Sequence, residues 1–156
     1  MTVLDRVQAL LRAHQASFSL SSHPPVYTSA QAAEVRGEEL KTGAKALIVK
    51  ADDQFVMLVL PGDRKLDNKR IKTKLGCKSF RFATREEVEG LTGLRIGSIP
   101  PFGSLLGTTT YCDRALGDNQ RINFNAGSHT ESINMGYMDY IKVEKPTLAD
   151  FSKHQP

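Results

Sequence analysis

The sequence predicts a single domain that combines helices with a mixed β-sheet, the α+β class. Its 156 residues can bury one core, and 40% apolar with 24% charged residues is an ordinary globular composition. Two apolar runs rich in β-branched residues, Ala46 to Lys50 and Gln54 to Leu60, predict a buried hairpin. On both sides of this hairpin, apolar residues recur at helical spacing. The two patterns together favour helices packed on a sheet.

The N-terminal part is predicted to hold two helices and one extended segment. Apolar residues at helical spacing predict an amphipathic helix over residues 2–14, and an extended segment follows at 18–22. The alanine-rich segment 29–36 begins with Ser29 and ends before Gly37, as a capped helix does. We expect this short helix to line one side of a cleft.

After the hairpin and its turn at 51–53, two more helices are predicted. Residues 67–75 place apolar side chains on one stripe and lysines on the other. Thr84 and Glu87 have the spacing of a capping box, which predicts a helix that extends to about Leu91. Both helices are expected to pack on the sheet.

The C-terminal third is predicted to be mainly short strands separated by Gly, Asp and Asn turns. We expect the domain to end near residue 147, with residues 148–156 as a tail or the start of a linker. The expected strands are 105–106, 108–112, 121–125 and 140–143.

The formal net charge of +4 and the pI of about 9.1 are modest, but the positive charge is concentrated in one segment. Between Arg64 and Arg85 lie nine Lys and Arg residues against the single acid Asp67. This block is a plausible phosphate-contacting face. The candidate phosphate contacts are Lys65, Lys69, Arg70, Lys72 and Lys74.

Cys77 and Cys112 stand alone, without a second cysteine or paired histidines nearby, so the sequence indicates neither a zinc site nor a disulfide. No cofactor motif is found. The N-terminus is charged where a secretory signal is apolar, and no run approaches a membrane span. We therefore expect a cytoplasmic protein with no metal, no cofactor and no membrane partner.

Three segments carry the candidate chemistry. The first, Gly97-Ser98-Ile99-Pro100-Pro101-Phe102-Gly103, is a rigid loop poor in side chains that can bring backbone N–H groups close to a ligand. Lys45 stands at the start of an apolar run. The third, Asn123 to Thr130, is a polar loop of small residues that contains Gly127, Ser128 and His129. A plain structural turn remains an alternative for the Gly97 to Gly103 loop. A solvated surface lysine remains an alternative for Lys45.

The ordered set of these segments resembles the YbaK/prolyl-tRNA-synthetase-associated (ProX-type) family of aminoacyl-tRNA deacylases, which act in trans as editing domains. The resemblance runs from His23 to Ile141 and includes Lys45 and the G-x-x-x-P run from Gly97 to Pro101. It implies a mostly antiparallel, barrel-like sheet with helices packed around it. It also implies hydrolysis of the ester in mischarged tRNA, with Ala-tRNA(Pro) the leading candidate and Cys- or Ser-charged tRNA the others.

The resemblance implies that the Lys45 ammonium orients the ester carbonyl and stabilises charge developing on its oxygen, while the free hydroxyl of the terminal ribose helps to activate water. The Gly97 to Gly103 segment would form the substrate wall. A Ser128–His129 nucleophile is rejected, because adjacent side chains rarely face each other. His129 is interpreted as a wall residue or a surface histidine. Tyr27 and Phe102 are candidates to stack on the terminal adenine, with burial in the core as the alternative.

Two other functions stay open at this point. The domain could be a non-catalytic module that binds tRNA or a synthetase, or the editing domain of a larger prolyl-tRNA synthetase or synthetase-associated protein. In each case the expected partner is the acceptor end of tRNA, with prolyl-tRNA synthetase as a further candidate. Turnover of a mischarged tRNA would distinguish the first alternative from an enzyme.

Overall fold

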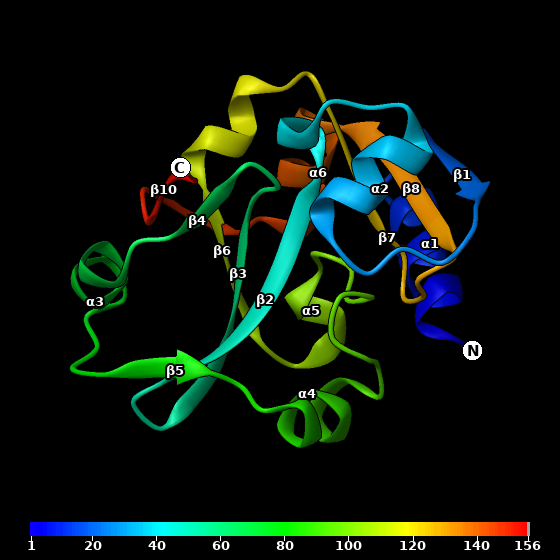
Figure 1. Ribbon diagram of the computed structural model, residues 1–156. Helices are drawn as coiled ribbons and strands as arrows, with labels where there is room; N and C mark the ends of the chain where they lie inside the picture. Colours follow the sequence, from blue (N-terminus) through cyan, green and yellow to red (C-terminus); the bar gives the residue numbers. More distant parts are fainter. Residues whose placement is uncertain (156) are drawn as a thin grey trace.

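The computed structural model describes residues 1–155, which form one α+β unit of helices and short strands around a central sheet (Figure 1). The helices are α1 (Val3–Ala13), α2 (Ser29–Arg36), α3 (Asn68–Leu75), α4 (Arg85–Thr92), α5 (Gly103–Leu106) and α6 (Tyr137–Glu144), with 3₁₀ turns η1 (Leu40–Thr42) and η2 (Arg114–Asp118). The strands are β1 (Phe18–Ser22), β2 (Ala44–Ala51), β3 (Gln54–Pro61), β4 (Arg64–Leu66), β5 (Phe80–Phe82), β6 (Thr109–Asp113), β7 (Arg121–Asn125), β8 (Glu131–Gly136), β9 (Thr147–Ala149) and β10 (Ser152–His154).

The central sheet has five strands in the order β5-β2-β3-β6-β9. Strands β2 and β3 form the predicted antiparallel hairpin, in register from the Ala44–Pro61 pair to the Ala51–Gln54 pair. Strand β6 lies parallel to β3, and β9 lies parallel to β6. A second, antiparallel sheet has the order β1-β8-β7, and β10 pairs with β4. The sheets are thus mixed and mostly antiparallel, as the resemblance implies.

The described strands do not close into a barrel, because they form three separate sheets. Strand β5 pairs only with the last three residues of β2, and β9 forms the opposite edge with three residues. One isolated bridge, between Gly43 and Asn123, joins the two larger sheets. The first part of β2 is therefore left with an open edge.

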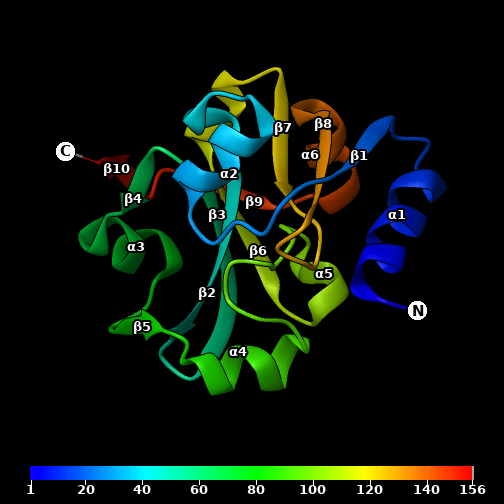
Figure 2. The same cartoon turned by 45° about the vertical axis from the view of Figure 1, so that its right-hand side comes forward.

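Side-chain alternation along β2 and β3 divides the core into two clusters, one on each face of the central sheet. On one face, Ile48 and Met57 pack with residues from β7, β8 and α6. On the other face, Val49 and Leu58 pack with Ile71 of α3. Figures 1 and 2 show α3 on one side of the β2–β3 hairpin and α1, β7 and β8 on the other.

Most predicted elements before residue 100 are confirmed, although β4 and β5 were not expected. The expected strand at 140–143 is wrong, because this segment is part of α6 and buries Tyr140, Val143 and Glu144 at helical spacing. Residues 105–106 belong to the short helix α5 rather than to a strand. Strand β8 was also missed.

The prediction of a tail from residue 148 is wrong for the described residues, because both terminal strands pair with the body of the domain. Phe151, between them, is fully buried. The buried carboxylate of Asp113 accepts hydrogen bonds from the backbone N–H groups of Ala115, Phe151 and Ser152. These contacts hold residues 147–154 in the fold. None of the described helices is long and apolar enough to cross a membrane.

Candidate active site

A cavity of about 210 Å³ lies along the open edge of β2, between α2 and the loop that precedes α5. In Figures 1 and 2, α2 lies beside the beginning of β2. The helix is held at its start by the Thr28 hydroxyl, which accepts a hydrogen bond from the Gln31 N–H, and at its end by Gly37 in the left-handed conformation. The cavity walls include Tyr27, Ser29, Ala32, Ala33, Arg36, Lys45, Ala46, Ile96, Gly97, Ile99, Phe124 and Asn125.

Lys45 is the cationic residue that β2 contributes to this cavity. Its side chain is half-buried, and burial lowers the pKa of the ammonium, while the nearby Asp63 opposes that shift. Within the described part of the chain, no carboxylate lies within 4.0 Å of its nitrogen. A partly desolvated ammonium that is not neutralised by a carboxylate interacts strongly with negative charge that develops beside it.

The wall opposite α2 is the loop around Gly97, and hydrogen bonds hold it in place. Gly97 has φ +89°, a conformation that side chains disfavour. Its carbonyl accepts a hydrogen bond of 2.7 Å from the Asn125 side-chain amide, and the Gly127 N–H donates to the Ser98 carbonyl. His129 donates from Nε2 to the Ile96 carbonyl at 3.1 Å, since a carbonyl can only accept. These hydrogen bonds join the two predicted loops, although Gly127 and His129 themselves do not line the cavity.

Tyr27 lies at the rim of the cavity and is 67% exposed. Its ring packs on the His129 imidazole, with 4.8 Å between ring centroids and 41° between planes. This arrangement leaves much of the aromatic ring open to solvent. The structure thus brings Tyr27 and His129 into contact, a pairing that the sequence did not predict.

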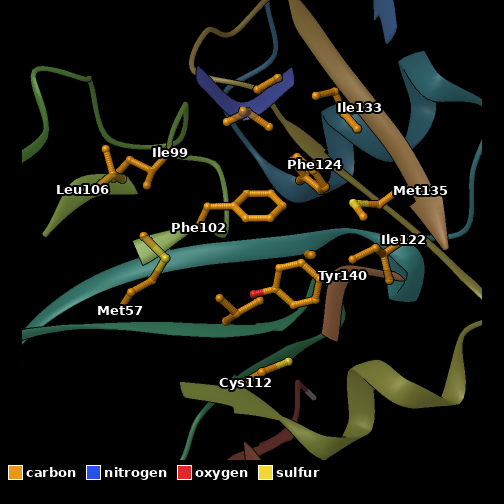
Figure 3. Packing of buried hydrophobic residues seen from close by; sticks show 14 of the residues in the cluster. Met57, Ile99, Phe102, Leu106, Cys112, Ile122, Phe124, Ile133, Met135 and Tyr140 are labelled. Carbon is orange, nitrogen blue, oxygen red and sulfur yellow. The ribbon is translucent and has the colours of Figure 1, made fainter. Parts of the chain in front are cut away.

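The second half of the predicted substrate loop does not line the cavity, because it is packed in the core. Phe102 is fully buried and packs edge-on against Phe124 and Tyr140 (Figure 3). The Tyr140 hydroxyl donates to the Pro101 carbonyl at 2.7 Å. Pro100 is buried as well. Of the two open readings of Phe102, burial in the core is the one that the structure supports.

Gly103 and the serines of the two loops also make structural contacts. The Gly103 N–H donates to the Thr110 hydroxyl, and an added Cβ at Gly103 would collide with atoms of Thr108 and Thr110. The buried Ser98 hydroxyl donates to the backbone of its own turn. Ser128 contacts neighbouring residues of its loop rather than His129. Neither serine lines the cavity.

Sequence reasoning missed Arg36, the last residue of α2. Its guanidinium donates hydrogen bonds to the side-chain oxygens of Asn123, Asn125 and Ser132, at 2.7, 2.9 and 2.9 Å. Burial lowers the pKa of Arg36 to about 10, and Glu38 partly opposes this shift. An arginine in the last turn of a helix is normally solvated, so no local pattern marked it. Only its place on the predicted cleft-lining helix pointed to it.

The predicted phosphate contacts lie on β4 and α3, and their side chains are exposed. Arg70 also donates to the carbonyl of Ser152 at 3.2 Å. In both Figure 1 and Figure 2, α3 lies away from α2. The cation block is therefore a separate surface and does not line the cavity.

A half-buried ammonium that lines the same cavity as the backbone of the Gly97 loop is typical of proteins that stabilise negative charge on an acyl oxygen. The family model of the aminoacyl-tRNA editing domain matches residues 23–143. The chain therefore belongs to the aminoacyl-tRNA editing domain family. This finding confirms the resemblance and, with the relatives below, the predicted enzyme class, a hydrolase of the aminoacyl-tRNA ester bond.

Relatives with similar sequences include bacterial deacylases and synthetases. The multifunctional Ser/Thr-tRNA deacylase ProXp-y of Escherichia coli K12 is 31% identical over 154 residues, which cover 96% of this chain and 92% of the relative. The uncharacterised protein YwhH of Bacillus subtilis is 35% identical over 69% of both chains. The proline–tRNA ligase of Thermosipho africanus is 37% identical over 52% of this chain, but only 14% of the ligase is covered.

Solved structures show the same fold. The hypothetical protein APE2540 superposes with a TM-score of 0.87 at 25% identity, over 95% of this chain and 99% of that chain. A candidate trans-editing enzyme for prolyl tRNA synthetase superposes with a TM-score of 0.86 at 23% identity, over 98% of both chains.

Proposed function

We propose that this domain hydrolyses the ester between a small amino acid and the terminal ribose of a mischarged tRNA. The observation that carries the proposal is the half-buried ammonium of Lys45 in a cavity of about 210 Å³. A cavity of this size suits a small amino acid better than a large one. The predicted substrate, alanine on tRNA(Pro), stays a prediction. The relative from Escherichia coli is named for Ser and Thr, which makes these two the necessary comparison.

In this mechanism the Lys45 ammonium stabilises the negative charge that develops on the carbonyl oxygen of the ester as water attacks the carbonyl carbon. The Gly97 loop forms the opposite wall and fixes the position of the acyl group, which reduces the entropy cost of reaching the transition state. Tyr27, at the rim, offers an exposed aromatic face on which the terminal adenine can stack. The substrate's own ribose hydroxyl would help to orient the attacking water.

The cation block would hold the tRNA body by contacts with its phosphates. Side chains alternate along β2, and Leu47 and Val49 pack in the same cluster as Ile71 of α3. Lys45 is two residues before Leu47, so its side chain leaves β2 on the face that α3 covers. A tRNA that contacts the exposed lysines of α3 would thus approach from the side on which Lys45 lies.

Release of labelled amino acid from proline tRNA charged with Ala, Cys, Ser, Thr or Pro tests the proposal. We expect release of one or more small amino acids by the wild type and a collapse of that release in Lys45→Ala. Lys50→Ala is the matched control, because Lys50 is on the same strand but packs over the Phe55 ring, 5.6 Å from its centroid. A folded protein that binds tRNA but releases none of these amino acids would contradict the proposal.

Salt dependence tests the phosphate contacts separately. When log binding affinity is plotted against log salt concentration, each lost phosphate contact makes the slope shallower by about 0.9 on duplex DNA and by less on single strands. The double variant Lys69→Glu/Lys72→Glu should therefore have a visibly shallower slope for tRNA. Lys142→Glu, an exposed lysine on α6, is the control. Equal slopes for the wild type and the double variant would exclude α3 from the interface.

A further inference from the structure

Arg36 connects elements that are far apart in the sequence. It ends α2 and lines both the cavity and a neighbouring open groove of about 710 Å³. Its guanidinium reaches Asn123 and Asn125 on β7 and Ser132 on β8. All three acceptors are neutral, and in residues 1–155 no carboxylate forms a salt bridge with it. The guanidinium is thus used as a set of directional donors rather than as half of an ion pair.

Through Asn125, Arg36 is linked to the opposite wall of the cavity. Arg36 donates to Asn125 Oδ1 at 2.9 Å, and Asn125 Nδ2 donates to the Gly97 carbonyl at 2.7 Å. Because the guanidinium can only donate and the carbonyl can only accept, the orientation of the amide between them is fixed. Two consecutive hydrogen bonds therefore join α2 to the Gly97 loop.

Through Asn123, Arg36 is linked to the segment just before Lys45. Arg36 donates to Asn123 Oδ1 at 2.7 Å, and Asn123 Nδ2 donates to the Thr42 hydroxyl at 2.9 Å. Thr42 ends η1, two residues before β2 begins. Asn123 is buried, so these bonds are shielded from water. The Arg36 guanidinium, on α2, is thus linked by hydrogen bonds to the other two cavity walls, the Gly97 loop and the start of β2.

Helix α2 buries little apolar surface that could fix its position. It has eight residues, and Ala32 is the buried residue among them. Burial of one alanine contributes little apolar stabilisation compared with a larger side chain. The wall that α2 presents to the cavity is therefore held largely by its caps and by Arg36.

We propose that Arg36 is a positioning residue that sets the width of the aminoacyl cavity and so determines which amino acids the site admits. The inference takes its substrate class from the proposed function. The positioning role itself is argued from the hydrogen bonds of Arg36. A hydrophobic pocket distinguishes side chains that differ by one methylene by about 10 to 200-fold, so a small outward movement of α2 is enough to lose that discrimination.

Arg36→Met tests the proposal, because it keeps the length of the side chain and removes the donors. We expect the ratio of kcat/KM for the preferred small amino acid over proline, both on the same tRNA, to fall by about tenfold or more. Arg36→Lys should not restore it, since one ammonium cannot span three separate acceptors. An unchanged ratio in a folded Arg36→Met variant would overturn the proposal, even if both rates fell together.

Arg121→Met is the matched control. Arg121 lies on β7 and donates to Asn134 Oδ1 at 2.6 Å, but it lines the neighbouring groove and not the cavity. Its loss should leave the substrate ratio unchanged. If Arg36→Met does not fold, Asn125→Ala replaces it, because this change cuts the link to Gly97 and keeps the other bonds of Arg36. The same fall in the ratio is expected, and its absence would again refute the proposal.

Hydrogen exchange separates this proposal from the proposed function, because it needs no turnover. In Arg36→Met, the amides of α2 should exchange faster than in the wild type, while those of β2 and β3 stay protected. Arg121→Met should show wild-type exchange in α2. Unchanged α2 protection would refute the positioning role whether or not the protein hydrolyses any ester. Faster exchange without hydrolysis by the wild type would refute only the proposed function.

Discussion

Replacement of Lys45 by methionine tests the proposed catalytic role of Lys45 most directly, because it removes the charge and keeps the length of the side chain. An ammonium about 4 Å from a unit negative charge gains about 4 kcal/mol at an effective dielectric of about 20. Lys45 is half-buried and therefore partly screened by water, so about 3 kcal/mol is a better estimate, as for one oxyanion donor. We expect kcat to fall by about 10²-fold.

Single-turnover deacylation measures this loss, with Lys50→Met as the control. The KM for tRNA should change little, because Lys45 interacts mainly with charge that appears in the transition state. A loss of kcat below about fivefold, or an equal loss in the control, would refute the electrostatic role.

The pH dependence gives a second test of Lys45. In the proposed mechanism the charged form is the active one, and burial lowers the pKa of the ammonium. After subtraction of spontaneous hydrolysis, the wild-type rate should therefore decline as the pH rises through a pKa below the usual lysine value of about 10.4. Lys45→Met should lack this decline. The same decline in the variant would assign it to another group.

Three further predictions concern the groups that support the site. Tyr140→Phe leaves the buried Pro101 carbonyl without its donor and should lower the free energy of unfolding by about 1–2 kcal/mol in urea denaturation. Asp113→Ala removes the acceptor of three backbone N–H groups and should cost about 3 kcal/mol, so a wild-type urea midpoint would contradict the anchoring role. Gly97→Ala adds a methyl group at φ +89° and 3.4 Å from His129 Nε2. We therefore expect about 1–2 kcal/mol of destabilisation and a slower deacylation rate. Full activity would show that the Gly97 wall is not rigid.

The sequence was sufficient to predict the part of the fold that local patterns encode. The β2–β3 hairpin follows from its apolar runs, and the first four helices follow from their stripes and caps. A strand was predicted around Tyr140 because a short apolar run is compatible with a strand or a helix. Residues after 147 lacked a strong pattern, and their order comes from long-range pairing and from Asp113.

The candidate site could be predicted only in part. Lys45 and Gly97 were found because the family motif contains them, and the structure brings both to one cavity. Phe102 is in the core because tertiary packing decides the direction of an aromatic ring after a proline pair. Arg36 was missed because its partners, such as Asn125, are distant in the sequence, and no single segment shows that they meet.

The strand order of the central sheet has a consequence for the protein during its synthesis. Strands β2 and β3 are neighbours in the chain and can pair as soon as both have left the ribosome, whereas β6 and β9 join them in parallel only after long intervening segments. Lys45 is thus in place on its hairpin before Asn125 and the other supports of the cavity have been made. We expect an unfinished chain to carry Lys45, the proposed catalytic residue, on an exposed strand edge and to gain hydrolytic competence only once its last third has folded.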